Sequence, residues 1–210
     1  MADCIFCSPE KIRQDILHET ANFFVKVGFG LYSAGHVMVI PKKHLDCYAC
    51  LPNCLEQEYD SLRYLVNSKI SGAFSRPFQI EMGVWGQSIR HAHVHFVPSE
   101  SKEYKIDNLV HELVLSGPEK IDVEQADRSR VKEIYRQEGG YVWIEDKGLT
   151  YVCHIKGLSF DPQNPHPQLT LRPFFSSIGV KGVSSWRDLT GEDQKRDNQK
   201  RDLTKKLLNF

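Results

Sequence analysis

Short apolar segments dominate the first hundred residues of the chain, and their spacing predicts strands arranged around one helix. Apolar side chains recur with a period near 3.6 between residues 53 and 74, which predicts a helix of about five turns. The strand segments are short, rich in apolar residues, and flanked by glycine or proline. These predicted strands cover residues 21–27, 36–40, 78–82 and 91–97.

The pattern of the second half is less regular, and it predicts a mixture of helices and strands. A weak helical stripe is ended by two glycines, and a turn of sequence Glu-Asp-Lys-Gly predicts a hairpin. The predicted segments are a helix at 123–137, strands at 141–144 and 150–155, an apolar segment at 169–175, and a terminal helix at 190–210 that opens on a capping box at Thr190. Residues 109–115 fit a helix or a strand equally well. We therefore expect an α+β fold.

Composition and charge exclude several classes of protein. The chain has 210 residues, of which 40% are hydrophobic and 26% charged, as in an ordinary globular protein. It carries 27 Lys and Arg against 27 Asp and Glu, so it lacks an overall basic footprint, and nucleic acid is not an expected partner although it is not excluded. No apolar run approaches the roughly 20 residues that cross a bilayer, so no membrane partner is expected. The N-terminus does not resemble a signal peptide, and a cytoplasmic, reducing location is expected.

Six cysteines include two pairs with the C-x-x-C spacing, which lets two thiolates reach one metal ion from a tight turn. Cys4 and Cys7 form the first pair, and a metal clip there would tie down an N-terminus that otherwise frays. Cys47 and Cys50 form the second pair. Together with Cys54, they are interpreted as small buried apolar residues, with metal binding as the alternative.

Three histidines alternate with apolar residues in the segment His91-Ala92-His93-Val94-His95. In a strand, alternate side chains share a face, so the three imidazoles are expected on one face, roughly 7 Å apart. Ala92 and Val94 would then point into the core. The pattern leaves two functional interpretations open, a metal site or imidazole chemistry on a charged substrate, and a solvated stripe without function is the weaker alternative.

The loop before this segment favours phosphoryl chemistry. Gly86, Gln87 and Ser88 offer neutral donors that suit phosphate oxygens. A neutral imidazole can attack phosphorus and hold a phosphoryl or nucleotidyl group covalently. A second imidazole can donate a proton to a phosphate oxygen or to the leaving group.

On these residues the chain resembles the histidine triad (HIT) family, in particular its zinc-bearing branch. His91 to Val97 fits the motif His-x-His-x-His followed by two apolar residues, and residues 35–44, Gly-His-Val-Met-Val-Ile-Pro-Lys-Lys-His, are similar to the second-strand signature. Cys4-Ile-Phe-Cys7 is similar to the zinc clip of that branch, and Gln87-Ser88 also matches. The resemblance covers roughly residues 1–98. It implies a HIT-like antiparallel sheet with a helix on one face in residues 1–100, followed by a C-terminal α+β extension of unknown role in residues 101–210.

The resemblance implies a nucleotide hydrolase or nucleotidyl transferase that cleaves a phosphoanhydride or phosphoramidate bond of a small-molecule nucleotide. His93 would be the nucleophile and would form a nucleotidyl-histidine intermediate. His95 would contact the phosphate and assist the leaving group, with Gln87 and Ser88 as further phosphate ligands.

The same resemblance implies a structural zinc ion and a homodimer. The implied zinc ligands are Cys4, Cys7, His44 and His91. They form a closed tetrahedral set that leaves no position for a reacting water. The rival set is Cys4, Cys7, Cys47 and Cys50. Pairing of two chains would use the helix and the sheet edge, although the long C-terminal half could cover that surface instead.

Two departures from the family pattern concern the nucleoside end of the pocket. Gly28 stands where many members have an Asp that binds the ribose, and Glu81 or its neighbours stand where many have an Asn. We therefore expect the C-terminal half to pack beside the triad and to shape the substrate end of the cleft, with a separate accessory domain as the alternative.

Two other functions remain open on the sequence. One is a non-catalytic nucleotide-binding or scaffold protein. The other is an enzyme that processes nucleotide-capped DNA or RNA ends with the basic terminal helix and the aromatic residues Trp143, Phe174, Phe175 and Trp186.

Overall fold

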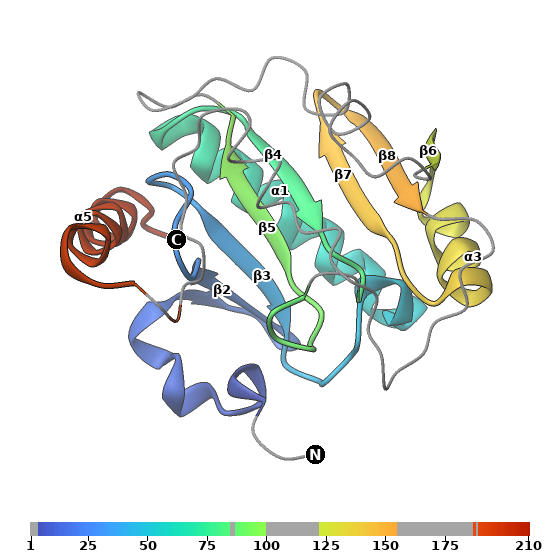
Figure 1. Cartoon of the computed structure of the whole chain (residues 1–210), viewed down its shortest axis with the longest axis horizontal. Coiled ribbons are helices and arrows are strands. Elements are labelled where there is room, and N and C mark those ends of the chain that lie inside the picture. The colour runs from blue at the N-terminus through green and yellow to red at the C-terminus, as the bar shows by residue number, and fades with distance from the viewer. Residues whose placement is uncertain (1–3, 85–86, 100–121, 155–186, 188) are drawn as a thin grey trace.

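The computed structural model describes residues 4–84, 87–99, 122–154, 187 and 189–210. Eight strands form one antiparallel sheet in the order β1-β2-β3-β5-β4-β7-β8-β6 (Figure 1). The strands are β1 Ile16–Glu19, β2 Phe23–Val27, β3 Val37–Pro41, β4 Pro77–Glu81, β5 Val94–Pro98, β6 Asp122–Gln125, β7 Val142–Asp146 and β8 Leu149–His154. The α-helices are α1 Glu56–Ala73, α3 Arg128–Glu138 and α5 Gly191–Leu207. The 3-10 turns are η1 Ile5–Cys7, η2 Pro9–Lys11, η3 Arg13–Asp15, η4 Tyr48–Cys50 and η5 Asn53–Leu55. The α+β class expected from the sequence is thus confirmed.

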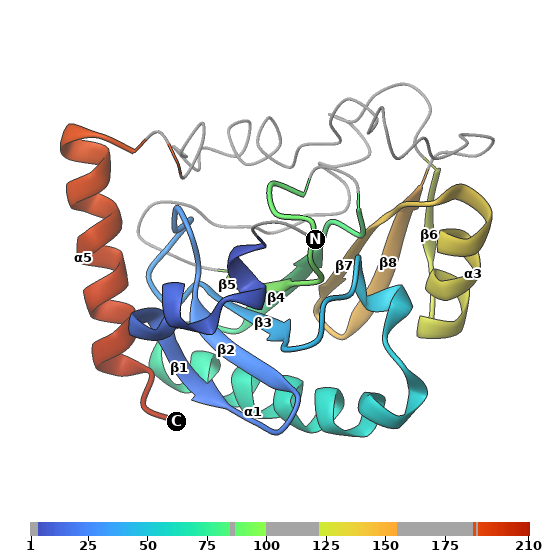
Figure 2. The same ribbon diagram turned by 90° about the horizontal axis from the view of Figure 1, so that it is seen from below.

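Helix α1 covers one face of the sheet, as its apolar stripe requires. Tyr59, Leu62, Val66 and Ile70 are the buried residues of this helix, and they share a core cluster with residues of β2, β3 and β5. Figure 2 shows α1 running beneath these strands. A second, smaller cluster on the same sheet includes Phe6, Ile12, Met38 and Ile40, so the N-terminal turns are anchored on it.

The strands from the C-terminal half continue the same sheet. β7 pairs with the outer edge of β4, with Ile144 opposite Ile80, and β8 and β6 follow. The predicted hairpin is confirmed: Lys147 and Gly148 connect β7 to β8, and both have positive φ angles, 53° and 77°. A two-residue hairpin turn whose twist matches that of the flanking strands requires left-handed backbone at both turn residues.

Some predicted boundaries are wrong. The helix expected from residue 123 begins only at Arg128, because Asp127 caps it by accepting a hydrogen bond from the Arg130 N–H at 2.8 Å. Residues 122–125 instead form the edge strand β6. The strand expected from His91 begins at Val94, and β1 was not anticipated.

The terminal helix is confirmed as α5, but the Thr190 side chain makes no capping bond. Gly139 ends α3 in the left-handed conformation, as expected (φ 73°). The segments expected at 109–115 and 169–175, together with Phe174, Phe175 and Trp186, lie outside the described residues. Within the described residues, every helix is too short or too polar to span a lipid bilayer.

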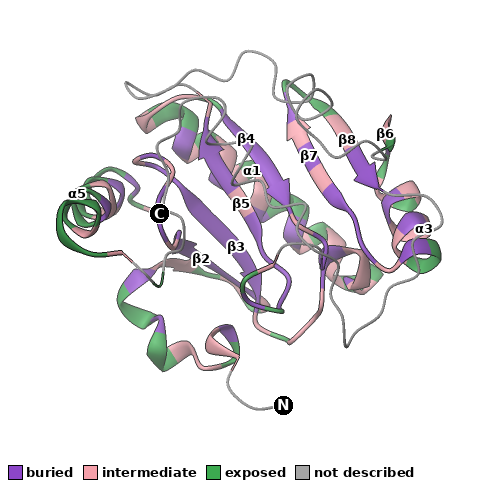
Figure 3. Cartoon of the chain, in the orientation of Figure 1, coloured by how far each residue is buried: buried purple, intermediate pink, exposed green. Residues whose placement is uncertain are grey.

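Burial is greatest in the middle of the sheet and falls towards β6 (Figure 3). All five residues of β2, β3 and β4 are buried, whereas both end residues of β6 are exposed. The histidines that the sequence singles out lie on or directly before β5, in this central region.

Candidate active site and metal centre

Four side chains that are distant in sequence meet at the N-terminal end of β5. Cys4 and Cys7 come from the turn at η1, His44 follows β3, and His91 precedes β5. One ligand atom from each residue lies within 4.8 Å of all the others. The Sγ of Cys4 lies 3.4 Å from Nδ1 of His91, and the Sγ of Cys7 lies 3.3 Å from Nδ1 of His44 and 3.5 Å from Nδ1 of His91. The structure therefore assembles the set that the sequence motifs indicated.

The donor set and its spacing fit a zinc ion. With Zn–S near 2.3 Å and Zn–N near 2.05 Å, a tetrahedral site separates a sulfur from a nitrogen by about 3.6 Å. The three separations between sulfur and nitrogen are close to this value. The Nε2 of His91 lies 2.8 Å from the carbonyl oxygen of Pro41 and must donate to it, which leaves Nδ1 unprotonated towards the sulfurs. The ring of His91 is thus oriented as a metal ligand needs to be.

The rival four-thiolate set is not assembled. Cys47 and Cys50 lie 3.8 Å from each other, but among the described residues neither belongs to the group formed with Cys4 and Cys7. Buried Cys47 instead packs with Val84, and Cys50 is partly buried. The interpretation of the second pair as buried residues is therefore correct for Cys47 and only partly correct for Cys50, while Cys54 is exposed.

His93 is held in one tautomer by its own backbone. Its Nδ1 lies 2.6 Å from the carbonyl oxygen of His91, and because a carbonyl only accepts, Nδ1 carries the proton. Burial lowers the pKa of His93 to about 4, so the ring is neutral at pH 7. Its Nε2 therefore keeps a free lone pair. This is the protonation state that a nucleophilic imidazole needs.

A fourth histidine completes the arrangement. The ring of His95 lies 4.9 Å from that of His93, and its Nδ1 lies 2.9 Å from Nε2 of His36. His36 is fully buried, which lowers its pKa to about 3, and its Nδ1 accepts a hydrogen bond from the Tyr32 N–H at 3.4 Å. The proton of neutral His36 is therefore on Nε2 and is donated to His95, whose own proton must be on Nε2.

A protein-family model matches the part of the chain that contains the triad. Residues 11–102 match the family model of the HIT domain. These residues form a HIT domain. The matched range includes His44 and all three triad histidines, whereas β6 to β8 and α5 lie beyond it.

Solved structures of HIT proteins resemble about half of the chain. A hypothetical histidine triad nucleotide-binding protein from Sulfolobus tokodaii is 29% identical, with a TM-score of 0.41 over 45% of this chain and 68% of that one. A HIT family protein from Bacillus anthracis is 22% identical, with a TM-score of 0.44 over 48% and 76% of the two chains. A Zn-bound histidine triad family protein from Mycobacterium smegmatis is 19% identical, with a TM-score of 0.39 over 48% and 78%. No curated protein sequence matches the chain.

His36 is a residue of the candidate site that the sequence does not single out, since its pattern predicts only the start of a strand. It stands in the Gly-His-apolar segment of residues 35–44. Gly28, where a ribose-binding acid was expected, faces this ring: a Cβ at Gly28 would lie 2.8 Å from two atoms of the His36 imidazole. Glycine at position 28 is therefore explained by close packing against His36.

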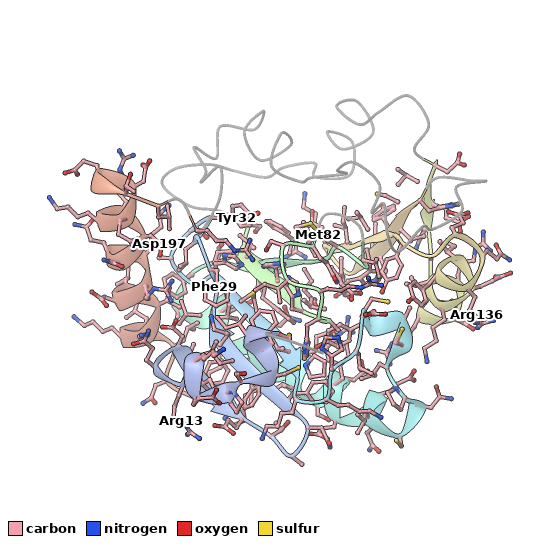
Figure 4. The ribbon with its side chains drawn as sticks, turned by 60° about the horizontal axis from the view of Figure 1, so that its bottom comes forward. Arg13, Phe29, Tyr32, Met82, Arg136 and Asp197 are labelled. Carbon is pink, nitrogen blue, oxygen red and sulfur yellow. The ribbon has the colours of Figure 1, made fainter. Side chains whose placement is uncertain are left out.

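Helix α5 holds the loop that carries this histidine. We call residues 28–36, between β2 and β3, the 28–36 loop. Asp197 accepts a hydrogen bond from the Leu31 N–H at 2.6 Å, and Thr204 accepts one from the Gly35 N–H at 2.8 Å. Figure 4 labels Asp197 on α5 and Tyr32 on the loop that faces it. The ring of Tyr32 stacks on His36 at 5.2 Å, so the C-terminal helix is connected to the triad through one layer of contacts.

A buried charge network fixes α5 to the N-terminal part. Asp15, the last residue of η3, lies 2.8 Å from Arg201 and 2.9 Å from Lys205 of α5, and 4.0 Å from Lys26 of β2. Burial lowers the pKa of Lys26 to about 7. Arg201 also pairs with Asp197 at 3.2 Å. The basic residues that the sequence suggested as a surface for nucleic acid therefore include two that are used inside the protein.

The remaining residues predicted for the site have other contacts. Gln87 donates from Nε2 to the carbonyl oxygen of Asp46 at 3.0 Å. Ser88 is exposed, and its carbonyl oxygen accepts from Arg187 at 3.0 Å. Glu81 is buried and accepts from the Tyr48 N–H and the Tyr141 hydroxyl, both at 2.6 Å, and burial raises its pKa to about 7. It thus connects β4 with η4 and with the segment that leads into β7.

Proposed function

We propose that the chain is a nucleotide hydrolase or nucleotidyl transferase that cleaves a phosphoanhydride or phosphoramidate bond through a nucleotidyl-His93 intermediate. The observation that carries the proposal is the tautomer of His93, with its Nδ1 proton bound to the His91 carbonyl and its Nε2 lone pair free. Two neighbouring imidazoles in defined tautomers support it.

In the first step, Nε2 of His93 attacks phosphorus and the bond to the leaving group breaks with its electron pair. His95, whose Nε2 carries a proton, donates a hydrogen bond from Nε2 to a phosphate oxygen or to the leaving group as negative charge develops there, and the leaving group takes its proton from water. His36 keeps His95 in this tautomer, because the Nε2 proton of His36 is directed at Nδ1 of His95. In the second step, water or another acceptor attacks the same phosphorus, and the bond to His93 breaks.

Gln87 and Ser88 are proposed as additional phosphate ligands, as the HIT resemblance implies. The hydrogen bond between Gln87 and the carbonyl oxygen of Asp46 anchors their loop. Asp46 lies two residues after the proposed metal ligand His44 and three residues before Ala49. This position supports a role in placing the phosphate beside the triad. It also means that a change at Gln87 will disturb the loop as well as any contact with substrate.

Zinc is proposed as a structural ion, bound by Cys4, Cys7, His44 and His91. Two thiolates and two imidazoles form a closed tetrahedral set, so the ion would supply fixed geometry without a position for a reacting water. Because His91 precedes His93 by two residues, binding at His91 would fix the start of β5. The carbonyl oxygen of the same His91 accepts the hydrogen bond from Nδ1 of His93, so the proposed metal site and the proposed nucleophile share one residue.

The homodimer expected from the resemblance stays a prediction, and the structure bears on how two chains could meet. β7 of the same chain already occupies the outer edge of β4. The two terminal strands of the sheet, β1 and β6, have four residues each. Light scattering at micromolar concentration distinguishes a mass near 24.2 kDa from twice that value. The cytoplasmic location also stays a prediction.

Rapid-quench mass spectrometry tests the proposed function. After mixing with nucleoside phosphoramidates and dinucleoside polyphosphates, the parent protein is expected to gain one nucleoside monophosphate, mapped to His93. His93→Asn should lose the adduct and at least 10³-fold in turnover. His18→Asn is the matched control, because His18 stacks on Phe210 away from the triad. Turnover within tenfold of the parent in His93→Asn would refute the assignment, and binding without any turnover would favour a non-catalytic protein.

A further inference from the structure

The second C-x-x-C pair is the motif that neither the proposed zinc site nor the triad uses. Cys47 precedes the turn η4 and Cys50 ends it, and the Cys50 N–H donates to the Cys47 carbonyl oxygen at 3.0 Å. The turn therefore closes the backbone so that both side chains meet. Their sulfur atoms lie 3.8 Å apart. A disulfide needs these atoms at about 2.05 Å, a change that rotation of the side chains provides without a new backbone fold.

The two sulfurs differ in access and in surroundings. Cys47 is fully buried (0% exposed) in the cluster that contains Val84 and Tyr141. Cys50 is only partly buried. A hydrogen bond from Cys47 lowers the pKa of Cys50 to about 6, and a second bond, from Tyr135 of α3, acts in the same direction. Burial raises the pKa of Cys47. One thiol is thus accessible and readily ionised, and the other lies behind it as a protonated partner.

We propose that Cys47 and Cys50 form a redox-active dithiol that reacts reversibly with low-molecular-weight disulfides. The Cys50 thiolate attacks one sulfur of the disulfide, a bond forms to Cys50, and one thiolate of the reagent leaves. Cys47 then loses its proton to solvent and attacks Cys50, which forms the internal disulfide and releases the second half of the reagent as a thiolate. The protein loses two electrons and the reagent gains them, so one disulfide replaces another.

This order of attack follows from the positions of the two sulfur atoms. The reagent can reach Cys50 from solvent, whereas Cys47 is closed off by the side chains around it. The resolving step needs only contact between the two sulfurs, which the turn already provides. Cys54 lies close in sequence and is exposed, but it has no such partner sulfur among the described residues.

The test is incubation of the full chain with oxidised and reduced glutathione at a series of ratios, followed by blocking of free thiols and digestion. Cleavage after Tyr48, which lies between the two cysteines, gives fragments that stay joined only if Cys47 is bonded to a cysteine of the following fragment, and in Cys54→Ser the nearest such cysteine is Cys50 alone. We expect this joined pair in the oxidised protein, in the parent and in Cys54→Ser alike, and its loss when reduced glutathione is in excess. Absence of the joined pair at every ratio overturns the proposal.

Two single variants test the order of attack. In Cys47→Ser, the first step can occur but resolution cannot, so glutathione is expected to accumulate on Cys50. In Cys50→Ser, the remaining thiol is buried, and adduct formation at Cys47 should be at least tenfold slower. Equal rates in both variants would overturn the assignment of Cys50 as the attacking sulfur. Measurement of the joined pair in the parent needs neither variant to fold, and none of these readouts depends on nucleotide turnover.

Discussion

The central strands of the HIT domain and the strands added by the C-terminal half belong to one sheet but are built differently. In β3 and β4 every residue is buried, whereas β7 alternates between buried and partly buried residues and β6 is exposed at both ends. The triad lies on and directly before β5, which runs between β3 and β4. The imidazoles of the triad are thus placed in the most enclosed part of the sheet.

Strands and a helix of the C-terminal half contact this enclosed region at both of its ends. At one end β7 pairs with β4 and so protects an edge that would otherwise be open to other strands. At the other end α5 holds the 28–36 loop beside His36. Figures 1 and 2 show α5 next to β2 and α3 at the opposite end. The C-terminal half therefore supports the HIT domain from two sides. The variants described below test how strongly the HIT domain and the C-terminal half depend on each other.

The largest effect is expected from loss of a proposed zinc ligand. Structural zinc contributes about 10–16 kcal/mol of binding free energy in small zinc domains, so the N-terminal turn and the start of β5 should lose order together. Cys7→Ala is expected to reduce zinc from about one ion per chain to a trace. Elemental analysis and thermal unfolding measure this. The double variant Cys47→Ala/Cys50→Ala is the control, and loss of zinc there would favour the four-thiolate set.

The next effect concerns α5. Asp197 is 4% exposed and binds both the Leu31 N–H and Arg201, so Asp197→Ala leaves the buried Leu31 N–H without its acceptor and removes one of the two carboxylates that pair with Arg201. We expect a loss of about 3 kcal/mol in the free energy of unfolding, because a buried donor is left unsatisfied and one charged pair is lost. Asp193→Ala on the same helix should change it by less than about 1 kcal/mol, because its pair with Arg196 is exposed. Urea unfolding of both variants gives the comparison, and equal values would mean that α5 does not support the loop.

The sequence predicted the central region well and the added region poorly, for a physical reason. Continuous apolar segments and the stripe of α1 depend on local burial, and the Cys and His motifs depend on local spacing. Both kinds of pattern can therefore be recognised in the sequence alone. The choice of β4 as partner of β7 is a long-range contact that alternation in residues 141–144 does not encode. Asp197 and Arg201 resemble a solvated helix face, since i,i+4 charge pairs look the same in sequence whether they are exposed or buried.

Glu81 gives a pH-dependent test of the junction between the two regions. Its pKa is raised by burial to about 7 in the folded protein, against 4.5 when free. The folded state therefore binds this proton more tightly than the unfolded state, and the contribution to stability is full below about pH 4.5 and is lost as the pH rises to about 7. The loss is on the order of 3 kcal/mol at 1.36 kcal/mol per unit.

Glu81→Gln should remove this slope when the free energy of unfolding is measured between pH 5 and 8, while exposed Glu192→Gln should retain it. A slope unchanged in Glu81→Gln would show that the carboxyl group is ionised throughout this range. Tyr48 and Tyr141 would then hold it as a carboxylate, since both donate to its oxygens.

The smallest effects come from one chemical change made in both regions. Gly72 lies in α1 of the HIT domain, and Gly148 lies in the β7–β8 turn with φ +77°; a Cβ at either position has no atom within 4 Å among the described residues. Gly72→Ala should stabilise the protein by about 0.5–1 kcal/mol, because alanine loses less backbone entropy in a helix. Gly148→Ala should destabilise it by about 1–2 kcal/mol, because an L side chain strains the left-handed backbone. Since neither methyl group meets a neighbour, the opposite signs isolate backbone conformation from packing. Shifts of the same sign in urea unfolding would contradict the left-handed turn that joins β7 to β8.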